Sequence, residues 1–532
     1  MNTRDFRTLF GVTLRRQRFA FAAWIGSFCL ILAILPNTYR NNLGSMKLRA
    51  SVIEMMDSNA ATRLLFGRIP HPGTLGQVIQ WESGMLISIF TAIAAILIVT
   101  AVGRRSEDDG LRELIEGTGV SRTTVFAVQA GIGATFSLGA GVLCGLTLAA
   151  QVPLLPEISV TGTIALALAI SLVGCAFSAV ALIVSQLADD AVRARRLSLM
   201  FLLLAFALRI VAEASGASWM RWLTPLGWKE QIMPFVEDRF IYAIPAAAIG
   251  LALSALAWRL YSGRELHGAY LRSAHRSTAH LHVGSIFSLA FRLGRYRLVS
   301  WSLGIVSMAA FVGSMAGSFV TLTKKNPNYE DLMTKMSGGG DTSSQIVSIF
   351  SVLIGILLIC ESASAISSLA DTEKRGILDA ELASGASRRG VIVAQALTAM
   401  AESAILAALG AVALSVTVGL SLDWESGRDV AWQASTQWPA AVCLIGVGCL
   451  FYAISRRLTA AAWALVGWSF VIAWFGGILN LPKWLLNMKL LGWSFSPTDS
   501  QHIPQALGLL AIGIAASALA TIVYRRRDIL TS

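Results

Sequence analysis

Two carboxylates of this 532-residue sequence stand inside long apolar runs, where an uncompensated charge is costly. Glu361 lies ten residues before Asp371, and Glu402 lies 14 residues beyond Arg388. At about 1.5 Å per helical residue, both carboxylates would lie roughly 15–21 Å deep on neighbouring helices. Glu361 and Glu402 are therefore the first candidates for a site that binds a cation or a proton.

Two interpretations of this pair stay open. In one, the carboxylates face a path through a helix bundle and attract cations or bind protons. In the other, they are protonated carboxyls inside the bundle, hydrogen-bonded to hydroxyls of Ser362, Ser364 or Ser403. Gln129 and Gln395, which match each other in the repeat described next, complete the candidate path.

A charged stretch occurs twice between apolar runs, as "EDDGLRELIEGTGVSRTTVFAVQ" at 107–129 and "EKRGILDAELASGASRRGVIVAQ" at 373–395. The two copies align at one offset of 266 residues. The matched pairs are Glu107/Glu373, Gly110/Gly376, Glu113/Asp379, Gly119/Gly385, Ser121/Ser387, Arg122/Arg388, Val125/Val391 and Gln129/Gln395.

The order of residues in this stretch predicts a short helix. The acidic residues come early, which suits a helix N-terminus, and Gly followed by Ser–Arg suits a helix end and a restart. A loop that is merely solvated needs no shared pattern, so we favour a docking helix for a soluble partner. Its candidate contact residues are Glu107, Gly110, Glu113 and Arg122, with Glu373, Gly376, Asp379 and Arg388 in the second copy.

Composition places these segments in a membrane protein. The chain is 55% hydrophobic and 14% charged, against roughly 25% charged residues in soluble proteins. The apolar runs are long and continuous, which predicts helices of about 20 residues rather than alternating barrel strands. Twelve spans are expected, at 19–36, 84–103, 123–151, 158–187, 197–214, 241–261, 298–320, 344–370, 390–421, 437–455, 459–480 and 503–524. The predicted fold is an all-α polytopic membrane protein.

Basic clusters predict the orientation of the chain. They flank alternate connections, for example at 15–18, 193–196, 292–297 and 525–527, and such connections face the cytoplasm. Both termini are then cytoplasmic. The net charge of +12 is dispersed over these boundaries, so we do not expect nucleic acid as a partner. None of the six cysteines has metal-ligand spacing, and no metal site is expected.

The repeat extends over the whole chain. Residues 9–24 resemble 286–301, "WMRWLTPLGW" at 219–228 resembles "WLLNMKLLGW" at 484–493, and "YSGREL" at 261–266 resembles "YRRRDI" at 524–529. We predict two parallel six-span repeats, 1–272 and 283–532, joined by a cytoplasmic linker at 273–282 and related by a pseudo-twofold axis along the membrane normal. Each repeat would open with an amphipathic segment on the cytoplasmic leaflet, in the first repeat through Phe6, Leu9, Phe10 and Leu14.

A tryptophan-rich segment at 215–240 is expected on the outer side. It would form an extracytoplasmic cap with its counterpart at 480–502, using Trp219, Trp222, Pro225 and Trp228. Thr224 and Lys489 are expected to be accessible from outside. Arg209 and Glu213, four residues apart in the preceding span, are expected to form a structural ion pair.

These motifs resemble those of the permease of a type-2 ATP-binding-cassette exporter. The nearest group is the fused, double-length permeases of actinobacterial antibiotic and multidrug exporters of the tetronasin type. The E-x-x-G-x-x-E segment at 107–113 and "WLTPLGWKEQIMPFVEDRF" at 222–240 carry the resemblance, together with Arg209. Where the family has a Gly-Arg pair, this chain has Gly110-Leu111 and Gly376-Ile377.

The resemblance implies a multi-pass permease of a bacterial cell membrane that expels drugs, antibiotics or other small amphiphilic substrates. The chain has no G-x-x-x-x-G-K-[ST] loop and is not expected to be an enzyme. ATP and magnesium would bind to a separate nucleotide-binding ATPase subunit, in two copies, and membrane lipids would surround the spans.

Two other classes of function are weighed against this one. A proton- or sodium-driven secondary transporter would use Glu361 and Glu402, and twelve spans suit it. A membrane enzyme acting on envelope lipids is less favoured, because the sequence has no cluster of His or paired Asp residues at either face.

Overall fold

The computed structural model describes most of the chain, in two compact units, Met1–Ser277 and Thr278–Ser532, called unit 1 and unit 2 here. The described residues are 2–42, 46, 49–50, 53–54, 63, 66–265, 268–271, 285–325, 342–374, 376–383, 385, 387–475, 488–495 and 502–527.

Among these residues all regular structure is helical, which confirms the prediction of an all-α polytopic membrane protein. Ten helical segments of the described chain are long and apolar enough to cross a membrane. The predicted spans 197–214 and 459–480 are not among them. The first lies within helix α9 (Ala191–Ser215), and the second begins in α20 (Ala460–Phe475) and continues outside the described residues.

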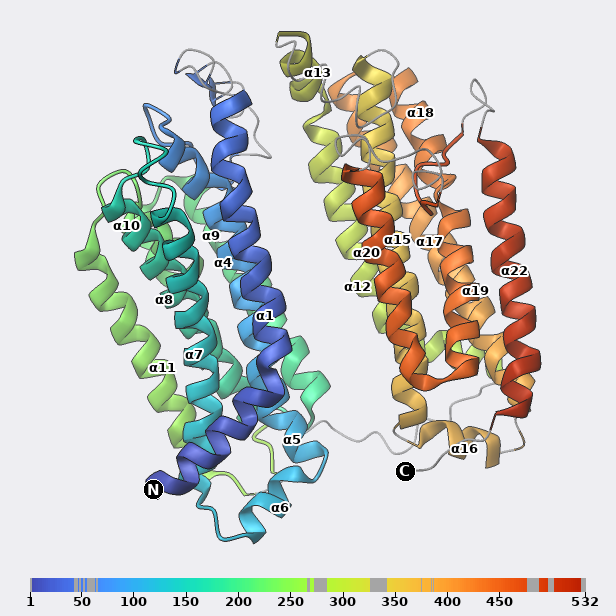
Figure 1. Ribbon diagram of the computed structural model, residues 1–532, viewed down its shortest axis with the longest axis horizontal. Coiled ribbons are helices and arrows are strands. Elements are labelled where there is room, and N and C mark those ends of the chain that lie inside the picture. Colours follow the sequence, from blue (N-terminus) through green and yellow to red (C-terminus); the bar gives the residue numbers. More distant parts are fainter. Residues whose placement is uncertain are drawn as a thin grey trace. The chain divides into compact units, whose positions relative to one another are not determined.

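Unit 1 is built around the long helix α8 (Val160–Leu187), which contacts α4, α7, α9, α10 and α11 (Figure 1). Its other helices are α1 (Thr3–Asn42), α4 (Leu75–Val102), α5 (Arg104–Asp108), α6 (Leu111–Gly117), α7 (Arg122–Ala149), α9, α10 (Trp228–Ile232) and α11 (Ala243–Gly263). Three short 3-10 turns, Ser218–Leu223, Pro225–Gly227 and Phe240–Tyr242, flank α10. Within this unit α5 and α6 lie at the same end as the N-terminus, and α10 lies at the opposite end.

Unit 2 has a corresponding pattern of helix contacts around α19 (Trp438–Ile454), which contacts α15, α17, α20 and α22. Its other helices are α12 (Ile286–Ser314), α13 (Ala316–Lys325), α15 (Thr342–Lys374), α16 (Ile377–Ala383), α17 (Arg388–Ser421), α18 (Trp424–Ser435), α20 and α22 (Ile503–Arg526). Helix α18 is an amphipathic insertion that the sequence analysis did not anticipate. It begins at Asp423, whose carboxylate accepts the backbone N–H of Ser426 at 2.8 Å.

Polar caps fix where the spans begin. Thr74 and Gln77 form a capping box at the start of α4, and Ser121 and Ser387 cap α7 and α17 through their hydroxyls. Each cap satisfies an N–H group that the helix itself leaves unpaired. The serines that follow the repeated Gly119 and Gly385 are therefore the predicted restart points.

The amphipathic start of unit 1 packs differently from the expectation. It is continuous with the first span in the single helix α1, and Phe6, Leu9, Phe10 and Leu14 pack against the unit's own core. The Phe10 ring lies so close to Gly131 of α7 that an added Cβ there would be 3.3 Å from it. The apolar face of this segment is thus partly covered by protein.

Candidate functional site

The first charged stretch is anchored by a buried carboxylate. Glu107 is 1% exposed, and its oxygens accept from Arg104 Nη1 at 3.3 Å, Arg112 Nη1 at 2.8 Å and Arg264 Nη2 at 2.6 Å. Arg122, at the start of α7, donates to the backbone carbonyl of Arg264. Glu107 was expected to contact a partner, but its side chain is buried. It fixes the charged stretch to the end of α11 instead.

The same arrangement occurs in unit 2. Arg527 Nη2 donates to Glu373 at 2.7 Å, and Arg388 Nη1 donates to the carbonyl of Arg527 at 2.8 Å. We call Glu107, Arg122 and Arg264 the first clamp, and Glu373, Arg388 and Arg527 the second clamp. Each clamp joins the end of its unit's second span, the start of the third and the end of the last.

Sequence reasoning missed Arg264 and Arg527, although the repeat contained the signal. They align at an offset of 263 residues in the matched "YSGREL" and "YRRRDI" segments, together with Tyr261 and Tyr524. Arg527 lies over the Tyr524 ring at 5.9 Å, and Arg122 lies over the Tyr261 ring at 5.5 Å. Each of the two segments thus supplies the arginine that completes the clamp of its unit.

The clamps differ in their charge. Arg104 and Arg112 contact Glu107 of the first clamp. At the offset of 266 the second unit has Ala370 and Leu378 in their places. Arg112 also donates to Glu116 and to the Tyr261 hydroxyl at 2.8 and 2.7 Å, whereas Leu378 is buried in an apolar cluster. Glu107 thus pairs with three guanidinium groups, whereas the carboxylate of Glu373 pairs with the guanidinium of Arg527.

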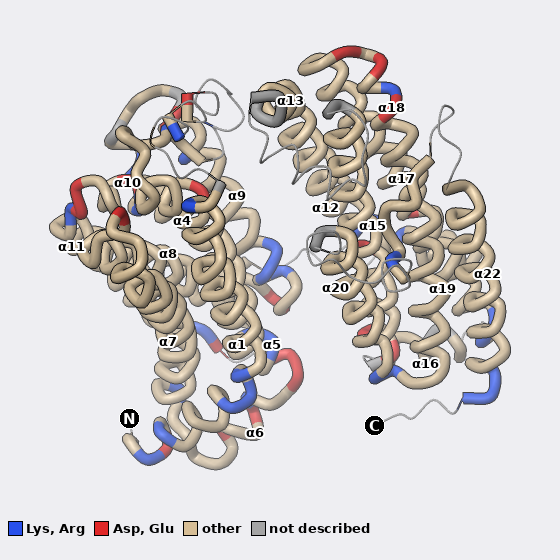
Figure 2. Tube along the Cα trace, turned by 45° about the horizontal axis from the view of Figure 1, so that its top comes forward, with Lys and Arg blue, Asp and Glu red and all other residues tan. Residues whose placement is uncertain are grey.

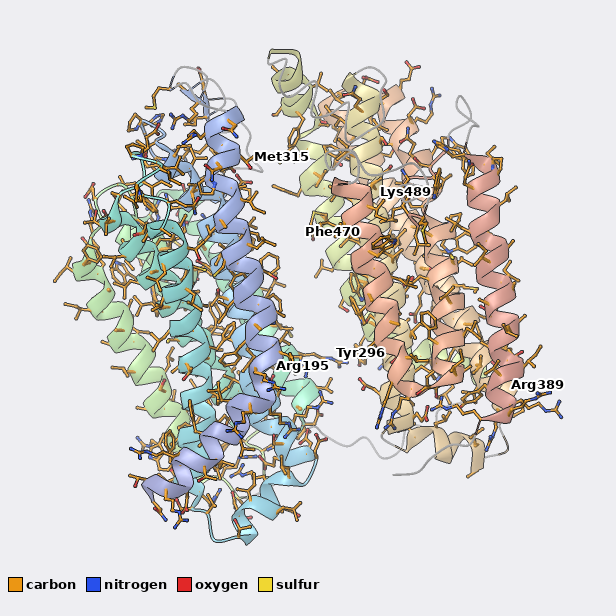
Figure 3. All side chains as sticks on the ribbon, viewed as in Figure 1. Arg195, Tyr296, Met315, Arg389, Phe470 and Lys489 are labelled. Carbon is orange, nitrogen blue, oxygen red and sulfur yellow. The ribbon has the colours of Figure 1, made fainter. Side chains whose placement is uncertain are left out.

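The clamps leave the following short helices exposed. Gly110 and Gly376 adopt left-handed φ values of 71° and 70°, which let the chain turn sharply into α6 and α16. On α6, Glu113 is exposed and Leu114 is 72% exposed, and on α16 Ile377 is 44% exposed. The side chain of Asp379 lies outside the described residues. Figure 3 shows Arg389 projecting from the α16 end of unit 2.

This asymmetry leads to a prediction. Changing Glu107 to Gln should lower the free energy of unfolding by about 3–5 kcal/mol, because it removes the buried carboxylate that three guanidinium groups share. Glu373→Gln should cost less, since one pairing is lost. Thermal unfolding of the full chain in detergent measures both, with the exposed Glu113→Gln as a control expected within about 0.5 kcal/mol of the parent. Equal, small effects of Glu107→Gln and Glu113→Gln would contradict the buried role of Glu107.

The carboxylates Glu361 and Glu402 share one arginine. Arg297 of α12 donates through Nε and Nη2 to Glu402 and lies 3.5 Å, at Nε, from Glu361, and its Nη1 donates to Ser368 at 2.8 Å. Both carboxylates are fully buried, and Arg297 ties α12 to α15 and α17. Arg297 belongs to the basic cluster at 292–297, which is expected to flank a cytoplasmic connection, and nothing in that pattern indicates a pairing with both acids.

Two of the three hydroxyls proposed as partners of these acids, those of Ser362 and Ser403, bond elsewhere. Ser362 donates to the Leu358 carbonyl, and Ser403 donates to the Met400 carbonyl and accepts the Trp438 indole N–H at 3.2 Å. Both hydroxyls thus donate to backbone carbonyls of their own helices rather than to the carboxylates. Ion pairing with Arg297 therefore replaces the expected serine contacts at these two positions.

Unit 1 has an apolar core in the corresponding place. The repeat aligns Arg297 with Ala20, Glu361 with Ala95 and Glu402 with Phe136, and Ala95 and Phe136 are fully buried among apolar side chains. All three charged residues are absent from unit 1 together. That is expected of one ion-pair network, because losing a single member would leave a buried charge uncompensated.

The two candidate glutamines are less informative about a path. Gln129 is 5% exposed, and its amide donates to the Val99 carbonyl at 3.2 Å. It fills the space beside Gly103, where an added Cβ would overlap its amide nitrogen. Gln129 thus packs against the C-terminal end of α4 and bonds to its backbone. Gln395 is half-buried in α17.

The tryptophan-rich segment of unit 1 is folded into the bundle end. Trp219 is 65% exposed and Trp222 packs edge-on against Tyr242, but Trp228 is 1% exposed and Pro225 is also buried. Trp228 is thus a core residue rather than an interfacial ring. Thr224 is fully buried, so the expectation that it is accessible from outside was wrong.

A phenylalanine anchors this segment between two spans. The Phe235 ring fills the space beside Gly76 of α4 and Gly162 of α8, where an added Cβ would lie 2.6 and 2.2 Å from it. The backbone N–H of Phe235 donates to Asp238 at 2.8 Å. These contacts explain why the segment carries Phe and Asp at this spacing.

The counterpart segment of unit 2 lies largely outside the described residues. Residues 488–495 are described, and Lys489 (Figure 3) lies 5.0 Å from the centre of the Trp493 ring. Lys489 is half-buried, and burial lowers the pKa of its amine. A cap formed by both segments stays a prediction.

Lys, Arg, Asp and Glu residues are concentrated toward the two ends of each unit (Figure 2). At the α10 end of unit 1, Arg209 pairs with Glu230, to which its Nε donates at 2.8 Å, and Glu213 accepts from Arg221 at 3.0 Å. The expected partners Arg209 and Glu213 therefore each pair with a residue of the tryptophan-rich segment.

Two comparisons with known proteins bear on this arrangement. A family model described as "Multidrug efflux system permease Rv1217c, C-terminal domain" matches residues 283–525. The chain is 27% identical over 536 residues to the "Multidrug efflux system permease protein Rv1217c" of Mycobacterium tuberculosis, covering 97% of this chain and 94% of that protein. The chain is a relative of that permease. The similarity spans both units and supports a multi-pass transmembrane permease.

Proposed function

We propose that this chain is the membrane permease subunit of an ATP-driven ATP-binding-cassette exporter that expels drugs, antibiotics or other small amphiphilic molecules. The observation that carries the proposal is the pair of clamps, each of which holds an exposed short helix at one end of its unit. The name of the Mycobacterium tuberculosis relative, a multidrug efflux system permease protein, supports the direction of transport.

The contacts of the clamps could transmit movement of α6 and α16 to the spans of their units. A partner that moves α6 would act through α5 and Glu107 on α4, through Arg122 on α7 and through Arg264 on the end of α11. In unit 2, Glu373, Arg388 and Arg527 connect α16 to α15, α17 and α22 in the same way. A rigid linkage of three spans can convert movement of one short helix into movement of the bundle.

The partner in this proposal is a nucleotide-binding ATPase subunit in two copies, one for α6 and one for α16. ATP and magnesium bind to that subunit. The ends of the units that carry α6 and α16, and both chain termini, then face the cytoplasm of a bacterial cell.

One observation favours a second candidate, a proton- or sodium-driven transporter. Arg297 supplies a single positive charge to two fully buried carboxylates, and neither oxygen of Glu361 accepts a hydrogen bond within the described chain. A proton or a sodium ion would balance the second carboxylate.

The source of energy distinguishes the two candidates. Inside-out vesicles containing the chain and its ATPase should accumulate the fluorescent amphiphile ethidium when ATP is added, and a protonophore or sodium ionophore should leave this uptake intact. A non-hydrolysable ATP analogue should not support it. Uptake driven by an imposed proton or sodium gradient without ATP would favour the second candidate instead.

A further inference from the structure

Unit 1 contains a cavity of about 230 Å³ at its α10 end. Its wall comes from residues 66–70, from α4, from the end of α9 and from the tryptophan-rich segment. Its lining includes Phe66, Arg68, Gln80, Trp81, Lys229 and Glu230.

The acidic groups of this wall are already neutralised. Glu230 accepts from Arg209 Nε at 2.8 Å, and Glu213 accepts from Arg221 Nη2 at 3.0 Å. Gly67 leaves room for the first pair, because an added Cβ there would lie 2.8 Å from Arg209 Nη2. Glu230 and Glu213 favour the charged form of the Lys229 amine from a distance, but neither forms an ion pair with it within 4.0 Å among the described residues.

Lys229 is therefore a buried cation held by neutral groups. It is 2% exposed, and its Nζ donates to the Gln80 carbonyl at 3.2 Å and to the Gln80 side-chain oxygen at 3.0 Å. Burial lowers the pKa of this amine to about 8, so it stays mostly protonated at neutral pH. A buried ammonium without a directly paired carboxylate is costly, and an anion entering the cavity would lower that cost.

The rest of the wall suits an apolar body. The Phe66 and Trp81 rings lie 5.0 Å apart, and Ile69, Met233 and Val236 complete an apolar lining. The exposed Arg68 adds a further positive charge, so the lining carries three cationic and two acidic side chains.

We propose that this cavity binds an amphiphile with an oxyanion head group, which pairs with Lys229 while its apolar body packs against Phe66 and Trp81. Either a dissolved organic acid or the phosphate of an anionic lipid offers this chemistry. The site does not depend on how transport is powered, because binding is measured without nucleotide or ion gradient.

Unit 2 offers a matched control. The repeat aligns Lys229 with Ser494, and the lysine of the second segment, Lys489, contacts Trp493 at another position. Replacing Lys489 therefore removes a comparable charge without touching the cavity of unit 1.

Equilibrium dialysis of radiolabelled 2-naphthoate against the full chain in phosphatidylcholine nanodiscs tests the proposal. Lys229→Gln should weaken binding by about tenfold or more, because it removes a charge-assisted hydrogen bond, whereas Lys229→Arg and Lys489→Gln should bind nearly as the parent does. Gln80→Glu should also weaken binding, since it supplies Lys229 with an internal carboxylate, and should leave the thermal unfolding midpoint unchanged or raised. This second variant separates loss of the site from loss of the fold.

Matched probes identify the charge and the source of the ligand. The amine 2-naphthylmethylamine, with the same rings, should not compete with 2-naphthoate. Nanodiscs containing phosphatidylglycerol should compete if a lipid phosphate occupies the site and should not if the ligand is a dissolved acid. Equal binding of 2-naphthoate by the parent, Lys229→Gln and Gln80→Glu, or equal competition by the amine, would overturn the proposal.

Discussion

Replacing Arg297 with methionine should destabilise the chain by about 3–5 kcal/mol, which is among the largest effects expected for a single substitution. The change removes the guanidinium that both buried carboxylates share, so that Glu361 and Glu402 are left facing each other in an apolar bundle. It also removes the hydrogen bond to Ser368 that ties α12 to α15. Thermal unfolding of the full chain, followed by the recovery of monodisperse protein, measures the loss.

Unit 1 supplies the control for this experiment. The triple variant Arg297→Ala, Glu361→Ala, Glu402→Phe installs the residues that the repeat places at the same positions in unit 1. It should recover most of the stability lost in Arg297→Met, because no buried charge is left unpaired. If Arg297→Met unfolds at the same temperature as the parent, the three residues do not form the network described here.

The second large effect is expected at the exposed short helices. Changing Leu114 to Glu on α6 and Ile377 to Glu on α16 should lower substrate-stimulated ATP hydrolysis of the assembled transporter at least about tenfold. Both side chains are exposed apolar groups beside the clamps, and a charge placed at the centre of a docking surface disrupts binding strongly. The charge reversal Glu113→Lys should also lower the rate of substrate-stimulated ATP hydrolysis.

These docking variants should fold normally, because Leu114 and Ile377 are exposed side chains. Their unfolding midpoints should match that of the parent, in contrast to Glu107→Gln. Full stimulated hydrolysis in the double variant Leu114→Glu, Ile377→Glu would show that α6 and α16 do not contact the ATPase.

The helical architecture could be predicted from sequence because apolar runs of about 20 residues have few alternatives in a membrane. The short helices followed from the acidic residues early in each charged stretch, and their ends followed from Gly119 and Gly385, which precede the capping serines Ser121 and Ser387. These features depend on neighbours within a few residues of the chain.

The buried pairings could not be predicted in this way. Glu107 was interpreted as a surface contact because its acidic neighbours suggest a helix start, but its partner Arg264 is 157 residues away. Arg297 was hidden in a basic cluster that the positive-inside rule explains equally well without it. Thr224 and Trp228 were placed at an interface by residue type, whereas the turns around Pro225 and Gly227 fold them inward.

One measurement tests the central claim most directly. Affinity purification of the full chain in mild detergent, from the bacterium in which it occurs, should recover an ATPase with a G-x-x-x-x-G-K-[ST] loop at two copies per chain. The same purification with the double variant Leu114→Glu, Ile377→Glu should recover little of it. Recovery of a folded chain that carries no ATPase, and that transports ethidium in liposomes with an ion gradient alone, would contradict an ATP-driven exporter.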